Sequence, residues 1–251
     1  MNIKEEPPFF ILGCVRSGTT LVRNLLRRQP NLICPEETHY YRWAEPFKSR
    51  RYTHTMFNNG TIIRHREIDG ISDEVFKRIY ESANSRADLL TGHITEFARA
   101  KGMTSYRWFE KTPQNVYGMG MIASDFPQSR FLHLVRNPLN VVASLKEGKI
   151  IKENDIVGAC NFWNEAISII NQQKKALSKR ILEVKYEDLT QDTAKTMAEI
   201  QSFFGIDEDA ASYSNEDTHT ERNRYKEILS ESEQLTVRQL CSHAGKTHGY
   251  F

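Results

Sequence analysis

Residues 13–20, which read GCVRSGTT, have the composition of a loop that binds a phosphate group. Gly13 and Gly18 bound this loop, an apolar segment precedes it, and an amphipathic helical pattern follows it. A glycine-bounded turn between a strand and a helix exposes backbone N–H groups at the positive end of the helix dipole, where an anion binds. Arg16 adds positive charge to the loop, so the segment predicts an anion site, although a tight turn without a ligand needs the same glycines. Hydroxyl donors follow at Ser17, Thr19 and Thr20.

The loop lacks the lysine that a nucleotide kinase needs. In a Walker phosphate loop this lysine follows the second glycine and reaches the terminal phosphates, whereas Thr19 stands there in this chain. The apolar segment 130–136 ends in Arg136, where a kinase would carry a carboxylate for Mg²⁺. An arginine repels a metal ion and attracts a second anion. We therefore expect a ligand with phosphate groups at two ends and no metal between them.

The elements around these residues predict an α/β fold. Short apolar segments at 9–13, 106–111, 130–136 and 180–186 alternate with helical patterns, which is typical of a P-loop-like, mostly parallel sheet flanked by helices. Ligands of such sheets bind beyond the carboxyl ends of the strands. We expect one crevice there, at the ends marked by Gly13, Lys111, Arg136 and Tyr186.

Helical patterns occupy most of the remaining chain. A helix is expected directly after Gly18, and the apolar spacing predicts others over 73–83, over about 156–177, and after Ser230, whose spacing to Glu233 forms a capping box. Residues 39–105 contain no clear strand and predict a helical insertion that covers the crevice. Residues 212–227 are polar and predict a loop, or lid, near the C-terminus.

Composition limits the classes of protein that fit. The chain has 251 residues, with 34 Lys and Arg against 32 Asp and Glu, so no surface for nucleic acid or another polyanion is expected. No apolar run predicts a signal peptide or a membrane span, which favours a cytoplasmic protein. The cysteines have no metal-ligand spacing, so we expect free thiols and no metal. The simplest organisation is a single domain over 1–251.

Two motifs in this order resemble the sulfotransferases that use 3′-phosphoadenosine 5′-phosphosulfate (PAPS). The family pairs a PRSGTT-like loop for the 5′-phosphosulfate with an RxPxxxxxS segment for the 3′-phosphate. This chain has VRSGTT at 15–20 and RNPLNVVAS at 136–144. The tyrosylprotein sulfotransferases and their bacterial relatives are the most similar branch. Their further motifs match PEET at 35–38, FEKTPQN at 109–115 and YEDL at 186–189.

The resemblance implies an enzyme, its reaction and the roles of its residues. A sulfuryl group would pass from PAPS to an acceptor hydroxyl by in-line displacement without a metal, leaving adenosine 3′,5′-bisphosphate. Glu37 would be the general base, Lys111 would neutralise the leaving oxygen, and Arg16 would hold the 5′-phosphate and act in catalysis. The implied cofactor-binding set is Arg16, Ser17, Gly18, Thr19, Thr20, Arg136, Ser144, Tyr186, Arg224 and Lys226.

The resemblance leaves the acceptor and the cellular setting open. The tyrosylprotein enzymes are membrane-anchored secretory proteins with a disulfide in this region, but Phe109 stands where the partner of Cys34 would be, so that bridge cannot form. The acceptor is either a small metabolite or a peptide tyrosine, and His39, His54 and His93 are candidate contacts to it. A P-loop kinase and a non-catalytic nucleotide-binding module remain the alternatives.

Overall fold

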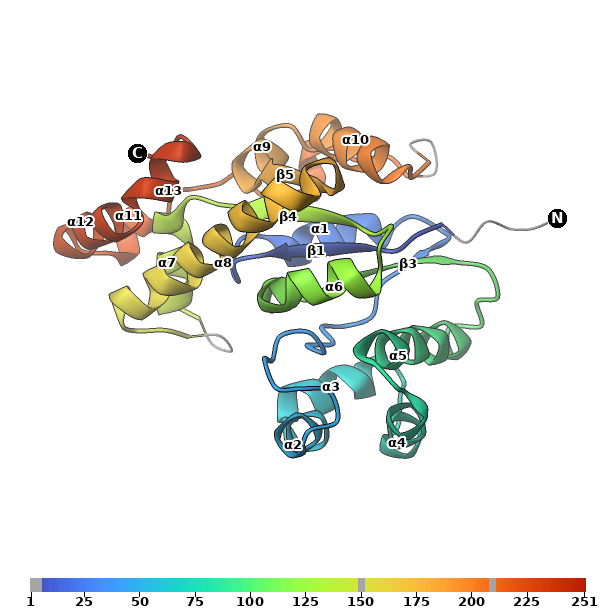
Figure 1. Cartoon of the computed structure of the whole chain (residues 1–251). Helices are drawn as coiled ribbons and strands as arrows, with labels where there is room; N and C mark the ends of the chain where they lie inside the picture. Colours follow the sequence, from blue (N-terminus) through green and yellow to red (C-terminus); the bar gives the residue numbers. More distant parts are fainter. Residues whose placement is uncertain (1–5, 149–151, 208–210) are drawn as a thin grey trace. The chain divides into compact units, whose positions relative to one another are not determined.

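The computed structural model describes residues 6–148, 152–207 and 211–251, and the strands in these ranges form one five-stranded sheet. The strand order is β2-β3-β1-β4-β5, all strands are parallel, and helices flank the sheet, which confirms the predicted α/β fold (Figure 1). The strands are β1 (Phe9–Gly13), β2 (Leu32–Ile33), β3 (Arg107–Lys111), β4 (Arg130–Val135) and β5 (Ile181–Lys185).

Helices fill most of the described chain between and after these strands. The predictions of helices after Gly18, over 73–83, over about 156–177 and after Ser230 are confirmed by α1, α4, α8 and α12. The α-helices are α1 (Thr19–Leu26), α2 (Arg50–Asn58), α3 (Gly60–Ile68), α4 (Asp73–Ser82), α5 (Arg86–Ala100), α6 (Met119–Asp125), α7 (Pro138–Lys146), α8 (Ile156–Leu177), α9 (Tyr186–Gln191), α10 (Thr193–Phe204), α11 (Tyr225–Ile228), α12 (Glu231–Leu240) and α13 (Ser242–Thr247). The 3₁₀ helices among the described residues are η1 (Pro113–Gly118), η2 (Ser178–Arg180) and η3 (Asn215–Asp217).

The chain divides into two compact units. Among the described residues, 6–12 and 23–131 form the first unit, and 13–22 with 132–251 form the second. The first unit therefore contains Glu37 and Lys111, whereas the second contains the phosphate loop and Arg136. The single domain over 1–251 stays a prediction.

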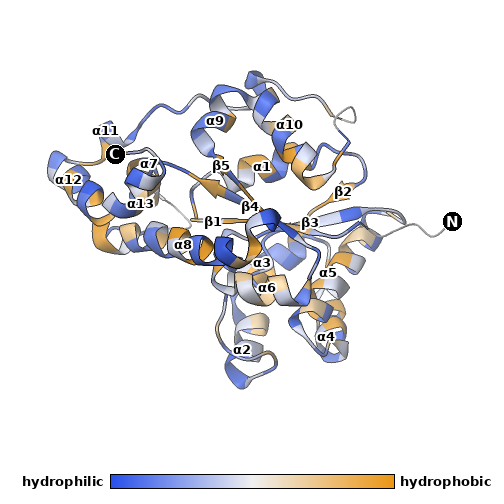
Figure 2. Cartoon of the chain, turned by 45° about the horizontal axis from the view of Figure 1, so that its top comes forward, coloured by the Kyte–Doolittle hydropathy of each residue, from blue (hydrophilic) through white to orange (hydrophobic). Residues whose placement is uncertain are grey.

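In the first unit, β3 pairs in parallel with both β1 and β2. Phe9 lies opposite Phe109, and their rings stack with centroids 4.9 Å apart. Figure 2 shows β1 and β2 as hydrophobic. The sequence of β3, RWFEK, ends in the charged residues Glu110 and Lys111. The sequence patterns missed β2 because its two residues are too short to show a period.

Residues 39–105 fold into α2, α3, α4 and α5 with no strand in that range, which confirms the helical nature of the predicted insertion (Figure 1). A side-chain oxygen caps the N-terminus of each helix, because it accepts a hydrogen bond from an otherwise unpaired N–H group. Two buried arginines fix the insertion: Arg86 donates to the carbonyls of Tyr40, Trp43 and Glu45, and Arg66 donates to that of Met56. The capping residues are Ser49, Asn59, Ser72 and Ser85.

In the second unit, α7, α8, α12 and α13 pack together around buried apolar residues (Figure 1). Trp163 of α8 is fully buried, and its Nε1–H donates to the carbonyl of Arg136 at 2.9 Å. The capping box of Ser230 and Glu233 is present at the start of α12, as predicted. Residues 212–227 are not loop throughout, since they include η3 and most of α11.

A cluster of ionisable side chains links β4, β5 and α8 in this unit. Glu183 contacts Lys174, accepts a hydrogen bond from His133 over 2.7 Å, and lies 3.4 Å from Nε2 of His248. Burial alone would raise the pKa of Glu183, but the hydrogen bonds from these neighbours outweigh it and hold the pKa well below its usual range.

Candidate active site

Both glycines of the predicted phosphate loop, residues 13–20, are required by the conformation of the backbone. Gly13 has φ 149° and Gly18 has φ 94°, in the region that favours glycine. A Cβ atom on Gly13 would lie 2.7 Å from the carbonyl oxygen of Leu134, and one on Gly18 would lie 2.3 Å from the ring of Tyr186. Arg16 also has positive φ, 69°. The tight turn predicted between β1 and α1 is therefore present, and only residues without a Cβ fit at its two glycines.

The structure brings the two predicted phosphate motifs to one cavity of about 380 Å³ in the second unit. Nε of Arg16 donates to Oγ of Ser144 at 2.9 Å, although 128 positions separate these residues in the chain. The cavity is thus lined by cationic groups from the loop, from the end of β4 and from the C-terminal region. Its polar lining residues are Arg16, Arg136, Asn140, Ser144, Glu147 and Arg224.

Three buried polar atoms in the second unit have no hydrogen-bond partner among the described residues: Nε2 of His133 on β4 and two atoms in the predicted phosphate motifs. The two motif atoms are Oγ of Ser17, whose residue is fully buried, and Oδ1 of Asn140, which lines the cavity. Buried polar groups are nearly always hydrogen-bonded, so each is an available partner for a ligand. Together with the cationic lining they fit an anionic ligand that also carries hydroxyl or amine groups. Thr19 is buried and Thr20 is exposed.

Arg136 pairs with a carboxylate of the chain itself. Its Nε and Nη2 lie 2.8 and 2.5 Å from one carboxylate oxygen of Glu221, and its Nη1 donates to the carbonyl of Arg16 at 3.0 Å. The guanidinium also stacks 4.4 Å from the ring centre of Tyr186. Burial raises the pKa of Tyr186, so its hydroxyl stays protonated. The carboxylate of Glu221 therefore occupies the N–H donors of Arg136 that the resemblance assigns to the 3′-phosphate.

Of the two C-terminal residues assigned to the cofactor, Arg224 lines the cavity and Lys226 is not among the described residues of its lining. Arg224 lines the cavity and pairs with Glu147 at 3.0 Å, with both side chains largely exposed. Lys226 is exposed and does not appear among the described residues that line the cavity. Glu221 was missed by the sequence patterns because an acid in a polar stretch carries no distinguishing signal.

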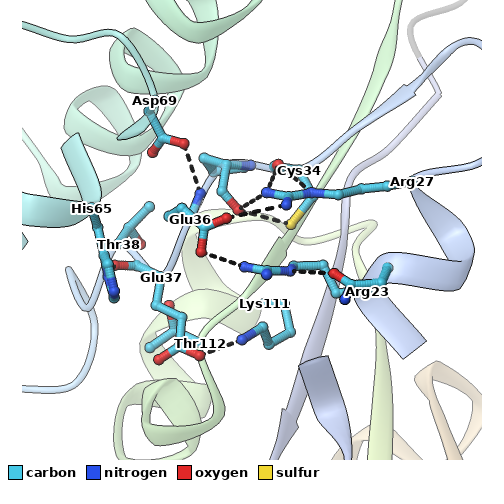
Figure 3. A network of polar contacts seen from close by, with 12 residues as sticks. Arg23, Arg27, Cys34, Glu36, Glu37, Thr38, His65, Asp69, Lys111 and Thr112 are labelled. Carbon is cyan, nitrogen blue, oxygen red and sulfur yellow. Dashed lines mark hydrogen bonds and ion pairs between the residues drawn. The ribbon is translucent and has the colours of Figure 1, made fainter. Parts of the chain in front are cut away.

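The first unit brings together the two residues assigned to acid–base and leaving-group chemistry (Figure 3). Nζ of Lys111, at the end of β3, donates to Oε1 of Glu37. The lysine side chain is 1 % exposed, whereas that of the glutamate is 20 % exposed. His65 of α3 donates through Nδ1 to the main-chain carbonyl of Glu37 at 2.8 Å, which fixes the backbone of this candidate base.

The neighbouring Glu36 has different partners (Figure 3). It pairs with Arg23 at 2.6 Å and with Arg27 at 3.1 Å, and its N–H donates to Asp69 at 2.9 Å. Burial alone would raise the pKa of Glu36, but its hydrogen bonds and the charges of the two arginines lower it overall. Glu36 thus anchors the segment, which leaves Glu37 as the carboxylate next to the lysine. The i, i+4 spacing of Arg23, in α1, and Arg27, directly after its end, was the signal available in the sequence.

A buried glutamate on β3, also missed, holds the residues after Glu37. Glu110 is fully buried and accepts hydrogen bonds from Thr38, Thr112 and Asn115. Burial raises its pKa, although these hydrogen bonds act in the opposite direction. The carbonyl oxygen of the Asn115 side chain in turn accepts the N–H of Tyr41 at 3.2 Å. The end of β3 therefore positions both Lys111 and the segment that carries Glu37.

The three candidate histidines have different environments. His93 is buried between Asp69 at 2.9 Å and the hydroxyl of Tyr40 at 2.7 Å, so it is a structural residue. His54 is exposed on α2. His39 is buried, with Nε2 3.7 Å from Oε2 of Glu37. Of the three, His39 is the one next to the candidate base.

In the part of the chain that the structure describes, no group of three or more His, Cys, Asp or Glu side chains could hold a metal ion. The described helices include none long and apolar enough to cross a membrane. All four cysteines are buried free thiols.

Comparisons with known proteins agree with this architecture. The chain is 26% identical over 208 residues to a protein-tyrosine sulfotransferase of Drosophila melanogaster, which covers 81% of this chain and 39% of that protein. It is also 26% identical over 208 residues to protein-tyrosine sulfotransferase 2 of Gallus gallus, covering 81% of this chain and 52% of the relative. The chain thus spans about half the length of the curated relatives that it matches.

Solved structures share the fold. The sulfotransferase domain of the Synechococcus PCC 7002 olefin synthase superposes with a TM-score of 0.68 at 22% identity, covering 98% of this chain and 97% of that one. A sulfotransferase from Mycobacterium avium gives a TM-score of 0.60 at 13% identity, covering 98% and 78%. The model of the family described as "Sulfotransferase family" matches residues 7–210. The chain therefore belongs to the sulfotransferase family.

Proposed function

We propose that the protein transfers a sulfuryl group from PAPS to an acceptor hydroxyl by in-line displacement without a metal. The observation that carries this proposal is the cavity of the second unit, which collects Arg16, Arg136 and Ser144 from two distant motifs. Membership of the sulfotransferase family supports the type of reaction. PAPS would supply the sulfuryl group, and the residues of the chain bind it, orient it and move the proton.

The cavity residues have the chemistry needed to hold a bisphosphate. Arg16 and the backbone N–H groups of the loop bind the 5′-phosphate, where Ser17 contributes its unpartnered hydroxyl. Arg136 and Ser144 bind the 3′-phosphate, for which the planar guanidinium offers two parallel donors. Gly18, Thr19, Thr20 and Tyr186 complete this part of the proposal, together with Arg224. Lys226 has the weakest support, because the cavity as described does not include it.

Glu37 and Lys111 have the chemistry needed for the transfer. The carboxylate of Glu37 is partly exposed and takes the proton of the acceptor hydroxyl as the oxygen attacks. Lys111 is a buried cation that neutralises the charge developing on the leaving oxygen. In this structure Nζ of Lys111 contacts Oε1 of Glu37, so the two groups already lie side by side.

The acceptor is proposed only as a class. The curated relatives are protein-tyrosine sulfotransferases, so a peptide tyrosine is one candidate, and a small-molecule hydroxyl is the other. The cytoplasmic location and the lack of a nucleic-acid partner remain proposals from composition.

Mass spectrometry of reaction products tests the function. The protein is incubated with PAPS and a mixed library of phenols, sugars, alcohols and tyrosine peptides, and the products are searched for the gain of one SO₃. Glu37→Gln is the matched control, since it should bind adenosine 3′,5′-bisphosphate normally but turn over about 10² to 10⁴ times more slowly. Thermal melts with each ligand supply a second test. A rise in the melting temperature of the wild type with ATP–Mg²⁺, but none with adenosine 3′,5′-bisphosphate, would indicate a kinase and contradict the proposal.

A further inference from the structure

His39 is a buried histidine whose ring has no hydrogen-bond partner among the described residues. Its side chain is 5 % exposed, and both Nδ1 and Nε2 are buried without a partner. The nearest acidic atom is Oε2 of Glu37, 3.7 Å from Nε2, which is too long for a hydrogen bond. Buried polar atoms are nearly always hydrogen-bonded, so two unpartnered nitrogens on one buried ring are unusual.

The backbone of His39 is held in an unfavourable conformation that keeps the ring beside Glu37. Its φ is 58°, in the left-handed region that is uncommon outside glycine. Its N–H donates to Thr112 at 3.4 Å, its carbonyl accepts from the N–H of Arg42 at 3.2 Å, and its ring stacks on that of His65 with centroids 5.8 Å apart. Strain of this kind persists where the surrounding structure fixes it, and it gathers at functional sites.

The proposed reaction requires Glu37 and Lys111 to separate. While the ammonium contacts Oε1, it occupies the carboxylate oxygen that would otherwise face the acceptor hydroxyl. The same ammonium cannot at that moment neutralise a leaving oxygen. Once Lys111 turns to that oxygen, the carboxylate loses one partner at the step in which its orientation matters most.

We propose that His39 is a positioning residue for Glu37: when Lys111 turns to the leaving oxygen, Nε2–H of His39 donates a hydrogen bond to Oε2 of the carboxylate. The move from 3.7 Å to hydrogen-bond distance is less than about 1 Å. This inference rests on the proposed function, because it needs Glu37 to act as the base.

The charge state of His39 suits this role. The ionisable groups around it are Glu37, Arg42, His65 and Lys111. Burial lowers the pKa of His39 to about 4, and Glu37 opposes that effect only in part. The ring is therefore neutral near pH 7. A neutral donor orients a carboxylate without the positive charge that would make it a weaker base.

Two substitutions and a control test the proposal by kinetics. His39→Leu removes the donor and His39→Gln restores an amide N–H, while the control His243→Gln alters an exposed histidine of the other unit. We expect His39→Leu to lower kcat roughly 10- to 100-fold with an unchanged KM for PAPS, and His39→Gln to recover most of the loss. Equal kcat in the Leu variant and the wild type, or no recovery with Gln, would overturn the proposal, and melting temperatures identify any variant that fails to fold.

Nuclear magnetic resonance of the histidine rings supplies a readout that does not need turnover. In Lys111→Met the carboxylate is free of the lysine, so the proton on Nε2 of His39 should move downfield and exchange more slowly. Both effects should vanish in the Lys111→Met, Glu37→Gln double variant. If they are missing in Lys111→Met itself, the inference fails, whereas a wild-type protein that never transfers SO₃ refutes the proposed function instead.

Discussion

Replacing Glu221 by glutamine should strengthen the binding of adenosine 3′,5′-bisphosphate. In the structure the carboxylate of Glu221 contacts Nε and Nη2 of Arg136, the donors that we assign to the 3′-phosphate. The ligand must break this pair before its own phosphate can bind. Glu221→Gln removes the negative charge while keeping the size of the side chain, so the arginine becomes easier to engage.

The magnitude follows from the burial of the pair. The side chains of Arg136 and Glu221 are only 17 % and 11 % exposed, so water screens them little. Hydrogen bonds between charged groups contribute about 1.5–3 kcal/mol in such settings, which corresponds to roughly 10- to 100-fold in affinity. The pair of Arg224 and Glu147 is 59 % and 45 % exposed, and exposed pairs contribute about 1 kcal/mol or less.

Isothermal titration calorimetry with the bisphosphate measures both effects under the same salt conditions. Glu221→Gln should lower Kd roughly 10- to 100-fold, whereas Glu147→Gln, the matched control, should change it less than about fivefold. An unchanged or weaker affinity in Glu221→Gln would refute the competition between this carboxylate and a phosphate. Equal gains in both variants would mean that net charge, and not the contact with Arg136, sets the affinity.

Three further predictions concern the structure around the site. Gly18→Ala should destabilise the fold by about 2–4 kcal/mol, because it places a Cβ at positive φ, 2.3 Å from the ring of Tyr186; Gly60→Ala, with nothing within 4 Å, should be near neutral in thermal melts. Glu36→Gln should cost about 1.5–3 kcal/mol by weakening its pairing with Arg23 and Arg27 but keep turnover within about tenfold, and a loss as large as that of Glu37→Gln would contradict our choice of base. Because the folded pKa of Glu183 lies below its unfolded value of about 4.3, its contribution to stability is present above that pH and disappears as the pH falls further. The melting temperatures of the wild type and Glu183→Gln should therefore converge in acid, and a constant difference down to pH 3 would exclude this linkage.

Local patterns were sufficient to predict the main elements of the fold. The phosphate loop, α4, α8 and the capping box of α12 each depend on neighbouring residues, and each lies where the spacing indicated. β2 was missed because two residues show no period, and α11 because its single turn lies in a polar stretch. Both form in the context of the folded chain rather than from local propensity.

The candidate site was predictable where a motif places residues at a fixed spacing. Arg16, Arg136 and Ser144 belong to two such motifs, and they line one cavity. The supporting residues come from positions that no spacing connects. For example, Glu221 contacts Arg136, 85 positions away in the chain, and Glu110 contacts Thr38, 72 positions away, so both pairs form only in the folded chain. A carboxylate in a loop or strand has the same sequence signal whether it is solvated or buried.

The most direct test of whether both motifs form one bisphosphate site is isothermal titration calorimetry. It compares the binding of adenosine 3′,5′-bisphosphate with that of adenosine 5′-phosphate in buffer without divalent metal. The wild type should bind the bisphosphate at least about tenfold more tightly, since Arg136 adds charged hydrogen bonds to the second phosphate. In Arg136→Ala this preference should disappear while the affinity for adenosine 5′-phosphate stays close to that of the wild type. Equal affinities in the wild type, or a preference that arises only when Mg²⁺ is added, would contradict the account.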